Sequence, residues 1–229
     1  MKMRILMLAT VLAVLGAGIF GAVKRQTYTD KAKEEGYLNR LQVAEMSAQL
    51  AKVWSDTFAE ELPDRSAFVL RVETVGELEH KFRANRQRVC VREIYAGSGV
   101  ECGQELYLYS NGWSFSLNSP PQSLERFFVN VLQVGKEYLV FADQLMEDPA
   151  GDISTLISNS DGSIFTPVFC YEPIENTVVR PVTFDGSTYV SYELVKDNEF
   201  FVASEGAKEI LEGLKEKYIA MYPPGGSQP

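Results

Sequence analysis

Histidine and cysteine are scarce in this sequence of 229 residues, which has one histidine, His80, and three cysteines, Cys90, Cys102 and Cys170. A Ser-His-Asp or Cys-His catalytic set needs histidine as its base, and His80 stands in the charged run GELEHKFRANRQR, which is typical of a solvated loop or strand edge. These four residues also lack the spacing of zinc ligands, and the acidic residues lack the spacing of a calcium loop. We therefore expect no cofactor and predict that the protein is not an enzyme.

Positive charge is scarce over most of the chain. The sequence has 22 Lys and Arg against 31 Asp and Glu. Residues 1–36 hold six basic and three acidic residues, a net charge of +3, whereas residues 37–229 hold 16 basic and 28 acidic residues, a net charge of −12. Because a domain this acidic is repelled by phosphate backbones, we expect no binding to nucleic acid.

One long apolar run lies near the N-terminus. Residues 5–23, ILMLATVLAVLGAGIFGAV, carry no charge and are flanked by Lys2, Arg4, Lys24 and Arg25. As a helix the run is about 28 Å long, close to the thickness of the hydrocarbon core of a bilayer. The run predicts an uncleaved transmembrane anchor over residues 1–25. The alternative is a cleaved signal peptide, although no small-x-small site ends the run.

The anchor predicts a compartment for the rest of the chain. Short N-terminal tails normally stay inside, although basic residues on both flanks weaken this rule. We expect residues 26–229 to lie outside the cytoplasm, in a single-pass protein of the cell membrane or, after cleavage, in a secreted protein. Three cysteines suit such a compartment. A disulfide between Cys90 and Cys102 is one possibility, a bridge from Cys170 to either is another, and buried free thiols are a third.

Residues 26–64 are predicted to form a helical segment next to the anchor. Over residues 30–61, apolar side chains recur at steps of three and four, as expected for an amphipathic helix. The stripe consists of Val43, Met46, Leu50, Val53, Trp54 and Phe58. Pro63 and Asp64 are expected to end the helix. The stripe favours packing against the following domain over binding to a partner.

Residues 65–222 are predicted to form a β-domain that ends in a helix. Period-two alternation with β-branched and aromatic residues indicates strands. The candidates are 67–78, 86–95, 104–110, 112–117, 127–133, 137–143, 164–171 and 188–203. Ser204 is a plausible N-cap for a helix with Ile210, Leu214 and Tyr218 on its apolar face. Residues 223–229 are predicted to be a disordered tail.

Short strands separated by turn residues indicate a barrel or a sandwich. Three segments carry a resemblance to a known family: AFVLRVETVGEL from residue 67, VCVREIYAG from residue 89, and VGKEYLVFA from residue 134. The pattern resembles the OB-type barrel of netrin-like and metalloproteinase-inhibitor-like domains of bacterial surface proteins, over about residues 67–145. The resemblance implies a mainly β fold with an OB-like antiparallel barrel and flanking helices. The inhibitory mechanism of that family needs an N-terminal cysteine, which this chain lacks.

The stretch from His80 to Arg92 is basic and contains no acid. Its charged residues are Lys81, Arg83, Arg86, Arg88 and Arg92. On a strand, Arg86, Arg88 and Arg92 share one face, so the stretch predicts a basic ridge for an anionic polymer, lipid headgroups or an acidic partner. The alternative is a solvated face paired with the chain's own carboxylates.

Together these features predict a membrane-anchored, extracytoplasmic binding or accessory module that presents a barrel surface to an envelope protein or another ligand. Two alternatives stay open. The first is a subunit of a larger membrane complex, held through the anchor and the stripe around Trp54. The second is an envelope hydrolase that uses carboxylates, which are abundant here but show no recognisable catalytic spacing.

Overall fold

The structure is a computed structural model of the chain. It describes residues 36–81, 84–110, 113–116, 123–125, 128–147, 153–158, 166–179, 182–184 and 187–225, together with Thr10, Val14 and residues 16–18. The chain divides into two units, residues 1–37 and 38–229. The second unit contains the sheets and the two long helices.

The predicted transmembrane helix at residues 5–23 lies mostly outside the described residues, which include only Thr10, Val14 and residues 16–18 of it. Among the described residues, no helix is long and apolar enough to cross a membrane. The two longest described helices, α2 (Ala48–Arg65) and α4 (Glu205–Met221), both carry charged residues along their length. The transmembrane helix and the single-pass assignment therefore have no support in the structure, and this part of the predicted fold is corrected.

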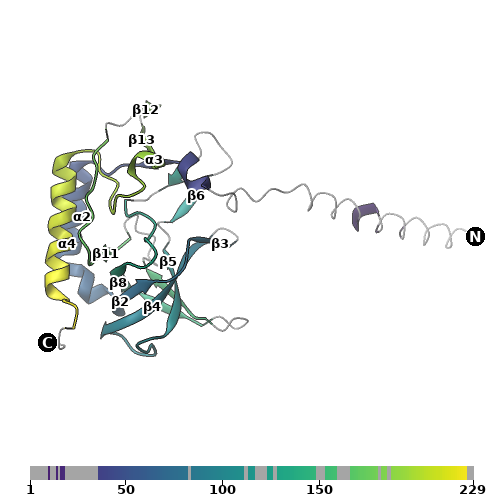
Figure 1. Cartoon of the computed structure of the whole chain (residues 1–229), viewed down its shortest axis with the longest axis horizontal. Coiled ribbons are helices and arrows are strands. Elements are labelled where there is room, and N and C mark those ends of the chain that lie inside the picture. The colour runs from purple at the N-terminus through teal and green to yellow at the C-terminus, as the bar shows by residue number, and fades with distance from the viewer. Residues whose placement is uncertain are drawn as a thin grey trace, which may run out of the picture. The chain divides into compact units, whose positions relative to one another are not determined.

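The main sheet has eight strands in the order β11-β8-β2-β4-β5-β10-β9, with β3 paired to β4. Figure 1 labels β2, β3, β4, β5, β8 and β11 of this sheet. The strands are β2 (Phe68–Thr74), β3 (Glu79–Lys81), β4 (Ala84–Ala96), β5 (Glu105–Ser110), β8 (Glu137–Ala142), β9 (Gln144–Met146), β10 (Thr155–Ser158) and β11 (Val168–Cys170). The long central strands β2 and β4 were predicted because apolar residues alternate along them. Val89 and Val91 are buried on one face of β4, whereas Arg88 and Arg92 point to the other.

The main sheet closes on itself. Strands β8 and β9 lie near opposite ends of the strand order, yet only Asp143 separates them in sequence. The Asp143 N–H donates to Ile157 O at 2.9 Å, and the Ser158 hydroxyl donates to Phe141 O at 2.8 Å. These bonds join β10 to the β8–β9 segment and leave a barrel whose interior is filled by side chains.

The barrel is mixed, so the expectation of an antiparallel barrel is wrong. Strand β10 pairs with β5 in parallel, with Leu156 opposite Leu108. Alternation of side chains along one strand does not record the direction of its neighbour, which is set by the path of the chain between the two strands. Here that path runs from Ser110 to Thr155 and passes through β8 and β9.

A second, smaller sheet has the order β12-β13-β1-β7-β6. Its strands are β1 (Gln42–Ala44), β6 (Ser114–Ser116), β7 (Ser123–Glu125), β12 (Val182–Phe184) and β13 (Ser187–Ser191). The predicted strand 188–203 is divided into β13, the short helix α3 (Tyr192–Val195) and two isolated bridges at Phe200 and Val202. The described part of the predicted strand 127–133 forms only a bridge, from Val129 to Phe200.

The helix predicted over residues 30–61 is wrong over residues 37–44, and residues 30–35 lie outside the described residues. Residues Tyr37–Arg40 form a 3-10 helix (η2), and Gln42–Ala44 form β1. Val43 pairs with Val190 and is fully buried, so its place in the helical periodicity is coincidental. Ser47 begins α2 by accepting the Leu50 N–H, and the helix continues through Pro63 to Arg65.

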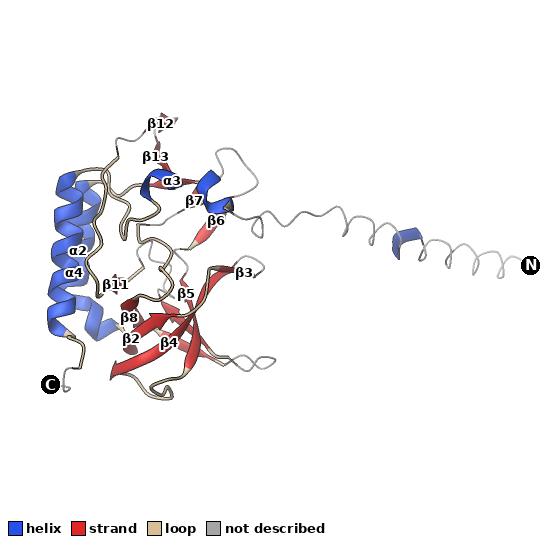
Figure 2. Cartoon of the chain, viewed as in Figure 1, coloured by secondary structure: helices blue, strands red, loops and turns tan. Residues whose placement is uncertain are grey.

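Helices α2 and α4 lie side by side on one face of the unit (Figure 2). They run parallel, because a parallel bridge joins Met46 to Val202 just before both helices begin. Near the other end the Tyr218 hydroxyl donates to Phe58 O. The Ser204 N-cap is confirmed, since its hydroxyl accepts the Ala207 N–H at 3.2 Å.

The core between these helices and the barrel is aromatic. Strand β8 is buried on both faces, and two of its residues, Leu139 and Phe141, belong to the same core as residues of α2 and α4. Phe169 of β11 stacks on Tyr218 of α4 with centroids 5.5 Å apart. Barrel and helices are thus held by one continuous apolar core.

Candidate functional site

The predicted basic ridge is paired with the chain's own carboxylates. Arg86, Arg88 and Arg92 lie on one face of β4, as expected from their spacing, and their side chains are 16%, 42% and 39% exposed. Their partners are Glu79 for Arg86 at 3.3 Å, Glu105 for Arg88 at 3.5 Å, and Glu73 for Arg92, whose Nε lies 2.9 Å from the carboxylate. Arg83 and the side chain of Lys81 lie outside the described residues. Because its three described arginines each have a glutamate partner, this face is a weaker candidate for an anionic ligand.

His80 has a structural partner. It lies in β3, and its Nδ1 is 2.6 Å from Asn85 Oδ1, so that Nδ1 carries the proton that is donated. Asn85 is buried and donates in turn to Trp113 O at 2.5 Å. This chain of bonds holds β3 against the end of β4.

The three cysteines are free thiols. Cys90 and Cys170 are buried, and Cys102 is exposed in the turn before β5, so the disulfide considered between Cys90 and Cys102 is not formed in the structure. Burial, with a smaller contribution from the carboxylate of Glu199, raises the pKa of the Cys170 thiol to about 11. A thiol that stays protonated at neutral pH is a poor nucleophile, so Cys170 is suited to a structural role.

The stripe predicted on the first helix is used inside the protein. Phe58 is buried, and Trp54 stacks on it with centroids 4.8 Å apart. Both residues belong to the core shared with α4, or pack against it. Val53 is the exception, because it is 56% exposed.

A groove runs between α4 and the segment that follows β11. Its volume is about 380 Å³. It is lined by Tyr171, Pro173, Ile174, Glu212, Lys215, Glu216 and Ile219. The apolar residues come from both walls, and the charged residues come from α4. We define these seven residues as the α4 groove and regard it as the candidate functional site.

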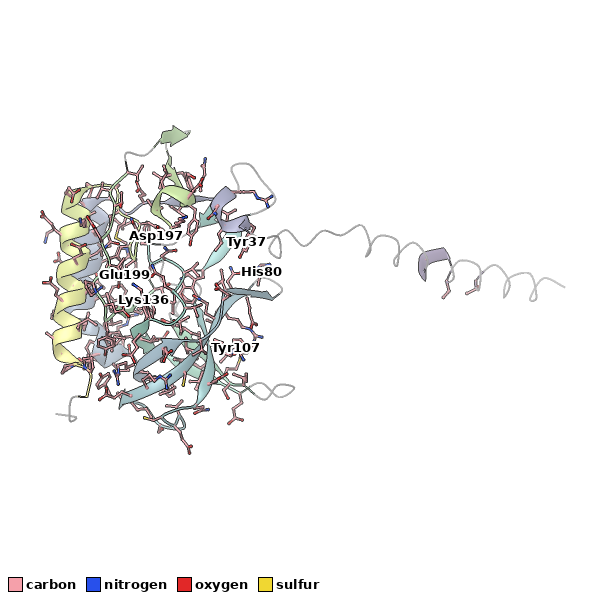
Figure 3. The ribbon with its side chains drawn as sticks, viewed as in Figure 1. Tyr37, His80, Tyr107, Lys136, Asp197 and Glu199 are labelled. Carbon is pink, nitrogen blue, oxygen red and sulfur yellow. The ribbon has the colours of Figure 1, made fainter. Side chains whose placement is uncertain are left out.

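The charge of Lys215 is neutralised beneath the groove. Its Nζ lies 2.5 Å from Glu199 Oε2, and the two side chains are 13% and 2% exposed. Figure 3 labels Glu199, beside the long helices. The other oxygen of Glu199 accepts the Cys170 N–H at 2.7 Å, and Lys215 also donates to Glu172 O at 3.0 Å. Burial raises the pKa of Glu199, while the ammonium of Lys215 opposes that rise. The pair therefore fixes α4, β11 and the groove wall to one another.

Two buried asparagines hold the irregular wall of the groove. Asn176 Oδ1 accepts the N–H groups of Glu199 and Phe200 at 2.8 and 2.9 Å, and its amide donates to Glu212 Oε1 at 3.0 Å. Asn198 accepts the Thr177 N–H at 2.9 Å and donates to Thr177 O at 2.7 Å. Loop backbone that cannot pair with a strand is satisfied by these amides, so the wall has a defined shape.

Another buried carboxylate, Glu45, lies away from the groove. It follows β1 and is 7% exposed, and neither of its oxygens has a hydrogen-bond partner among the described residues. Burial raises its pKa to about 7, well above the value in an unfolded chain. The folded state thus binds a proton that the unfolded state releases between about pH 4.5 and pH 7.

We expect Glu45 to make the protein less stable as pH rises. The free energy of unfolding should fall by about 1–3 kcal/mol between pH 5 and pH 8 through this group. In Glu45→Gln that part of the pH dependence should disappear. Urea unfolding at several pH values measures it, with Glu101→Gln, an exposed position, as the control. An identical pH profile for wild type and Glu45→Gln would show that the carboxylate is not buried as described.

The chain matches no protein-family model, and no curated protein matches it. Sequence reasoning missed the α4 groove because its two walls lie about 40 residues apart and neither contains a motif. The one available signal was Glu199, a charged residue at the start of the otherwise apolar run EFFVA.

Proposed function

We propose that the protein is a binding or accessory module, not an enzyme, and that the α4 groove holds a segment of a partner protein. The observation that carries this proposal is an apolar trough, formed by Tyr171, Pro173, Ile174 and Ile219, next to the carboxylates of α4. Apolar surface that stays open on a folded domain gains free energy when a partner covers it.

The negative charge of the groove lining favours a partner segment with basic side chains. Glu212 and Glu216 line it, and the charge of Lys215 is already matched by Glu199. The lining thus presents net negative charge, and residues 37–229 as a whole carry a net charge of −12. A segment with apolar and basic side chains complements both features, and the charge also speeds its association.

The OB-type resemblance stays a prediction, and the proposal uses only the barrel itself. The barrel runs through β8, β2, β4, β5 and β10 and returns to the β8–β9 segment, with the parallel pair at β5 and β10. Small β-barrels can use exposed faces and loops to bind chain-like ligands. Fold alone does not decide activity, so the barrel names no ligand. An envelope partner and a place outside the cytoplasm remain predictions.

A peptide-binding experiment tests the proposal. The probe is a fluorescein-labelled octapeptide of alternating leucine and lysine, and fluorescence anisotropy measures its dissociation constant. We expect Ile219→Asp and Glu216→Lys each to weaken binding at least tenfold, because the first places a charge in the trough and the second reverses the charge of the lining.

Two matched variants and one matched peptide serve as controls. Val53→Asp places the same charge on the exposed face of α2, and Glu101→Lys makes the same charge reversal on a distant turn, so neither should change binding. In the peptide control, glutamate replaces lysine, and this peptide should not bind. Equal binding of both peptides, or unchanged binding to Ile219→Asp, would overturn the proposal.

A further inference from the structure

The last described residues of the chain lie along the outer wall of the barrel, beside Tyr171, which also lines the α4 groove. Tyr222 follows α4, and its carbonyl accepts the Tyr171 hydroxyl at 2.8 Å. The Gly225 N–H donates to Glu93 Oε2 at 3.0 Å. The Tyr95 hydroxyl lies 3.0 Å from Pro223 O and 3.1 Å from the same Glu93 oxygen. We call Glu93, Tyr95 and Tyr171 the tyrosine clasp.

Contacts that do not involve residues 222–225 also hold the clasp residues in place. Arg71 Nε lies 3.2 Å from Glu93 Oε2, and Arg71 Nη1 lies 3.0 Å from Glu137 Oε2, so the carboxylate is oriented by the barrel itself. The hydroxyls of Tyr95 and Tyr171 lie 3.2 Å apart. The donors and acceptors that meet the tail are therefore preorganised on β4 and on the residue after β11.

The contacts favour a particular tail sequence. The ring of Tyr222 packs on Tyr95 and Phe141, with centroids 5.2 and 5.7 Å away. Two prolines follow, and their fixed φ lowers the entropy lost when the segment is bound. Gly225 has a φ of 69°, which favours glycine at the position where the N–H reaches Glu93. Each residue of the Tyr-Pro-Pro-Gly sequence therefore contributes to binding in the clasp.

The tail is held loosely enough to leave. Pro223, Pro224 and Gly225 are exposed, and few hydrogen bonds hold them to the barrel. Each such bond contributes little net stability, so release of this short segment costs far less than unfolding of the domain. We propose that the tyrosine clasp is a binding site for Tyr-Pro-Pro-Gly segments, and that residues 222–225 of a second copy of this chain occupy it by exchange.

A second copy of the chain carries the matching segment, because the residues that fill the clasp within one molecule are its own residues 222–225. Within one molecule the tether keeps the tail at a high effective concentration, so the closed clasp resists competitors. The advantage is lost when one molecule has a vacant clasp and another has a segment that its own clasp cannot hold. Binding of the segment of one molecule to the clasp of the other then becomes measurable.

A peptide of residues 220–226, AMYPPGG with a fluorescein label, tests recognition. The host is the full chain with Tyr222→Ser, Pro223→Ser and Pro224→Ser, which we call the open variant. We expect the peptide to bind the open variant at least tenfold more tightly than it binds wild type. Adding Glu93→Gln or Tyr95→Phe should weaken binding at least fivefold, whereas Tyr107→Phe, the same change on β5, should not.

Mixing two variants tests the source of the segment. The damaged-clasp variant carries Glu93→Gln and Tyr95→Phe, so its residues 222–225 are intact but its clasp cannot hold them. The open variant has an intact clasp but lacks the segment that fills it. We expect a mixed dimer by light scattering only when the two are combined. Peptide binding without a mixed dimer would overturn the assignment to a second copy, and no preference of the peptide for the open variant would overturn the site.

Amide hydrogen exchange keeps the proposal testable if the open variant does not fold. In the intact chain, the Gly225 N–H should exchange at least tenfold faster in Glu93→Gln than in wild type or Tyr107→Phe. Equal exchange in all three would show that Glu93 does not hold the tail, and would remove the basis of the clasp.

Discussion

Replacing Lys215 by methionine should lower the free energy of unfolding by about 3–5 kcal/mol at pH 8. The substitution leaves the Glu199 carboxylate buried without its cation, since the Glu199 side chain is 2% exposed and keeps the hydrogen bond from the Cys170 N–H. Methionine keeps the apolar length of the side chain, so most of the loss comes from the unpaired charge. Urea unfolding followed by circular dichroism measures the effect.

The pH dependence separates charge from packing. Burial already raises the pKa of Glu199, and without Lys215 the pKa should rise further, so the folded state of the variant would bind a proton at a higher pH than the unfolded chain. Its stability should thus be lost as pH rises and recovered toward pH 5. The double variant Glu199→Gln, Lys215→Met should regain most of the loss at pH 8.

A second cation gives the matched control. Lys52 pairs with Asp56 at 3.1 Å, but the two side chains are 70% and 66% exposed. Lys52→Met should therefore change stability by about 0.5 kcal/mol or less. If Lys215→Met costs no more than Lys52→Met, the buried pair does not hold the groove wall.

Replacing Phe169 by alanine should cost about 3–5 kcal/mol, because the ring is fully buried and its loss leaves a cavity. The ring stacks on Tyr218 and meets Phe141 and Phe200 edge-on at 6.3 and 6.4 Å. This is where β11, α4 and the barrel share side chains. We expect circular dichroism and tryptophan fluorescence to report the same lowered urea midpoint, as for one cooperative unit.

Met146 provides the comparison for Phe169. It lies on β9 and is 49% exposed, so Met146→Ala should change stability by about 0.5 kcal/mol or less. Phe169→Leu should fall between the two. Separate midpoints for the two probes in Phe169→Ala would mean that barrel and helices unfold independently, contrary to a shared core.

The fold was predictable from the sequence wherever a single strand or helix has a recognisable local pattern of residues. Strands β2, β4, β5 and β8 alternate or are wholly apolar, and Ser204 marks the start of α4. The pairing of strands was not predictable, because β5 and β10 meet in parallel across a long intervening path. Strand β1 was predicted as helix because Val43 and Met46 also fit a helical period, and only contact with β13 decides between the two.

The candidate site was less predictable than the fold. The basic residues of β4 were visible in sequence, but their neutralisation depends on Glu73, Glu79 and Glu105, which other strands bring alongside them. Lys215 and Glu199 belong to different predicted elements. Their pairing is a product of the tertiary fold, and a single sequence contains no local pattern that reports it.

The parallel bridge between Met46 and Val202 joins segments that lie far apart along the chain. During synthesis, α2 emerges from the ribosome long before α4 exists, so the apolar face around Phe58 and Leu62 lacks its cover by α4 until that helix is made. Closing so long a loop is entropically costly, and folding of the core is delayed until α4 has been synthesised. A nascent chain stalled before residue 200 would therefore present this face to chaperones or to aggregation.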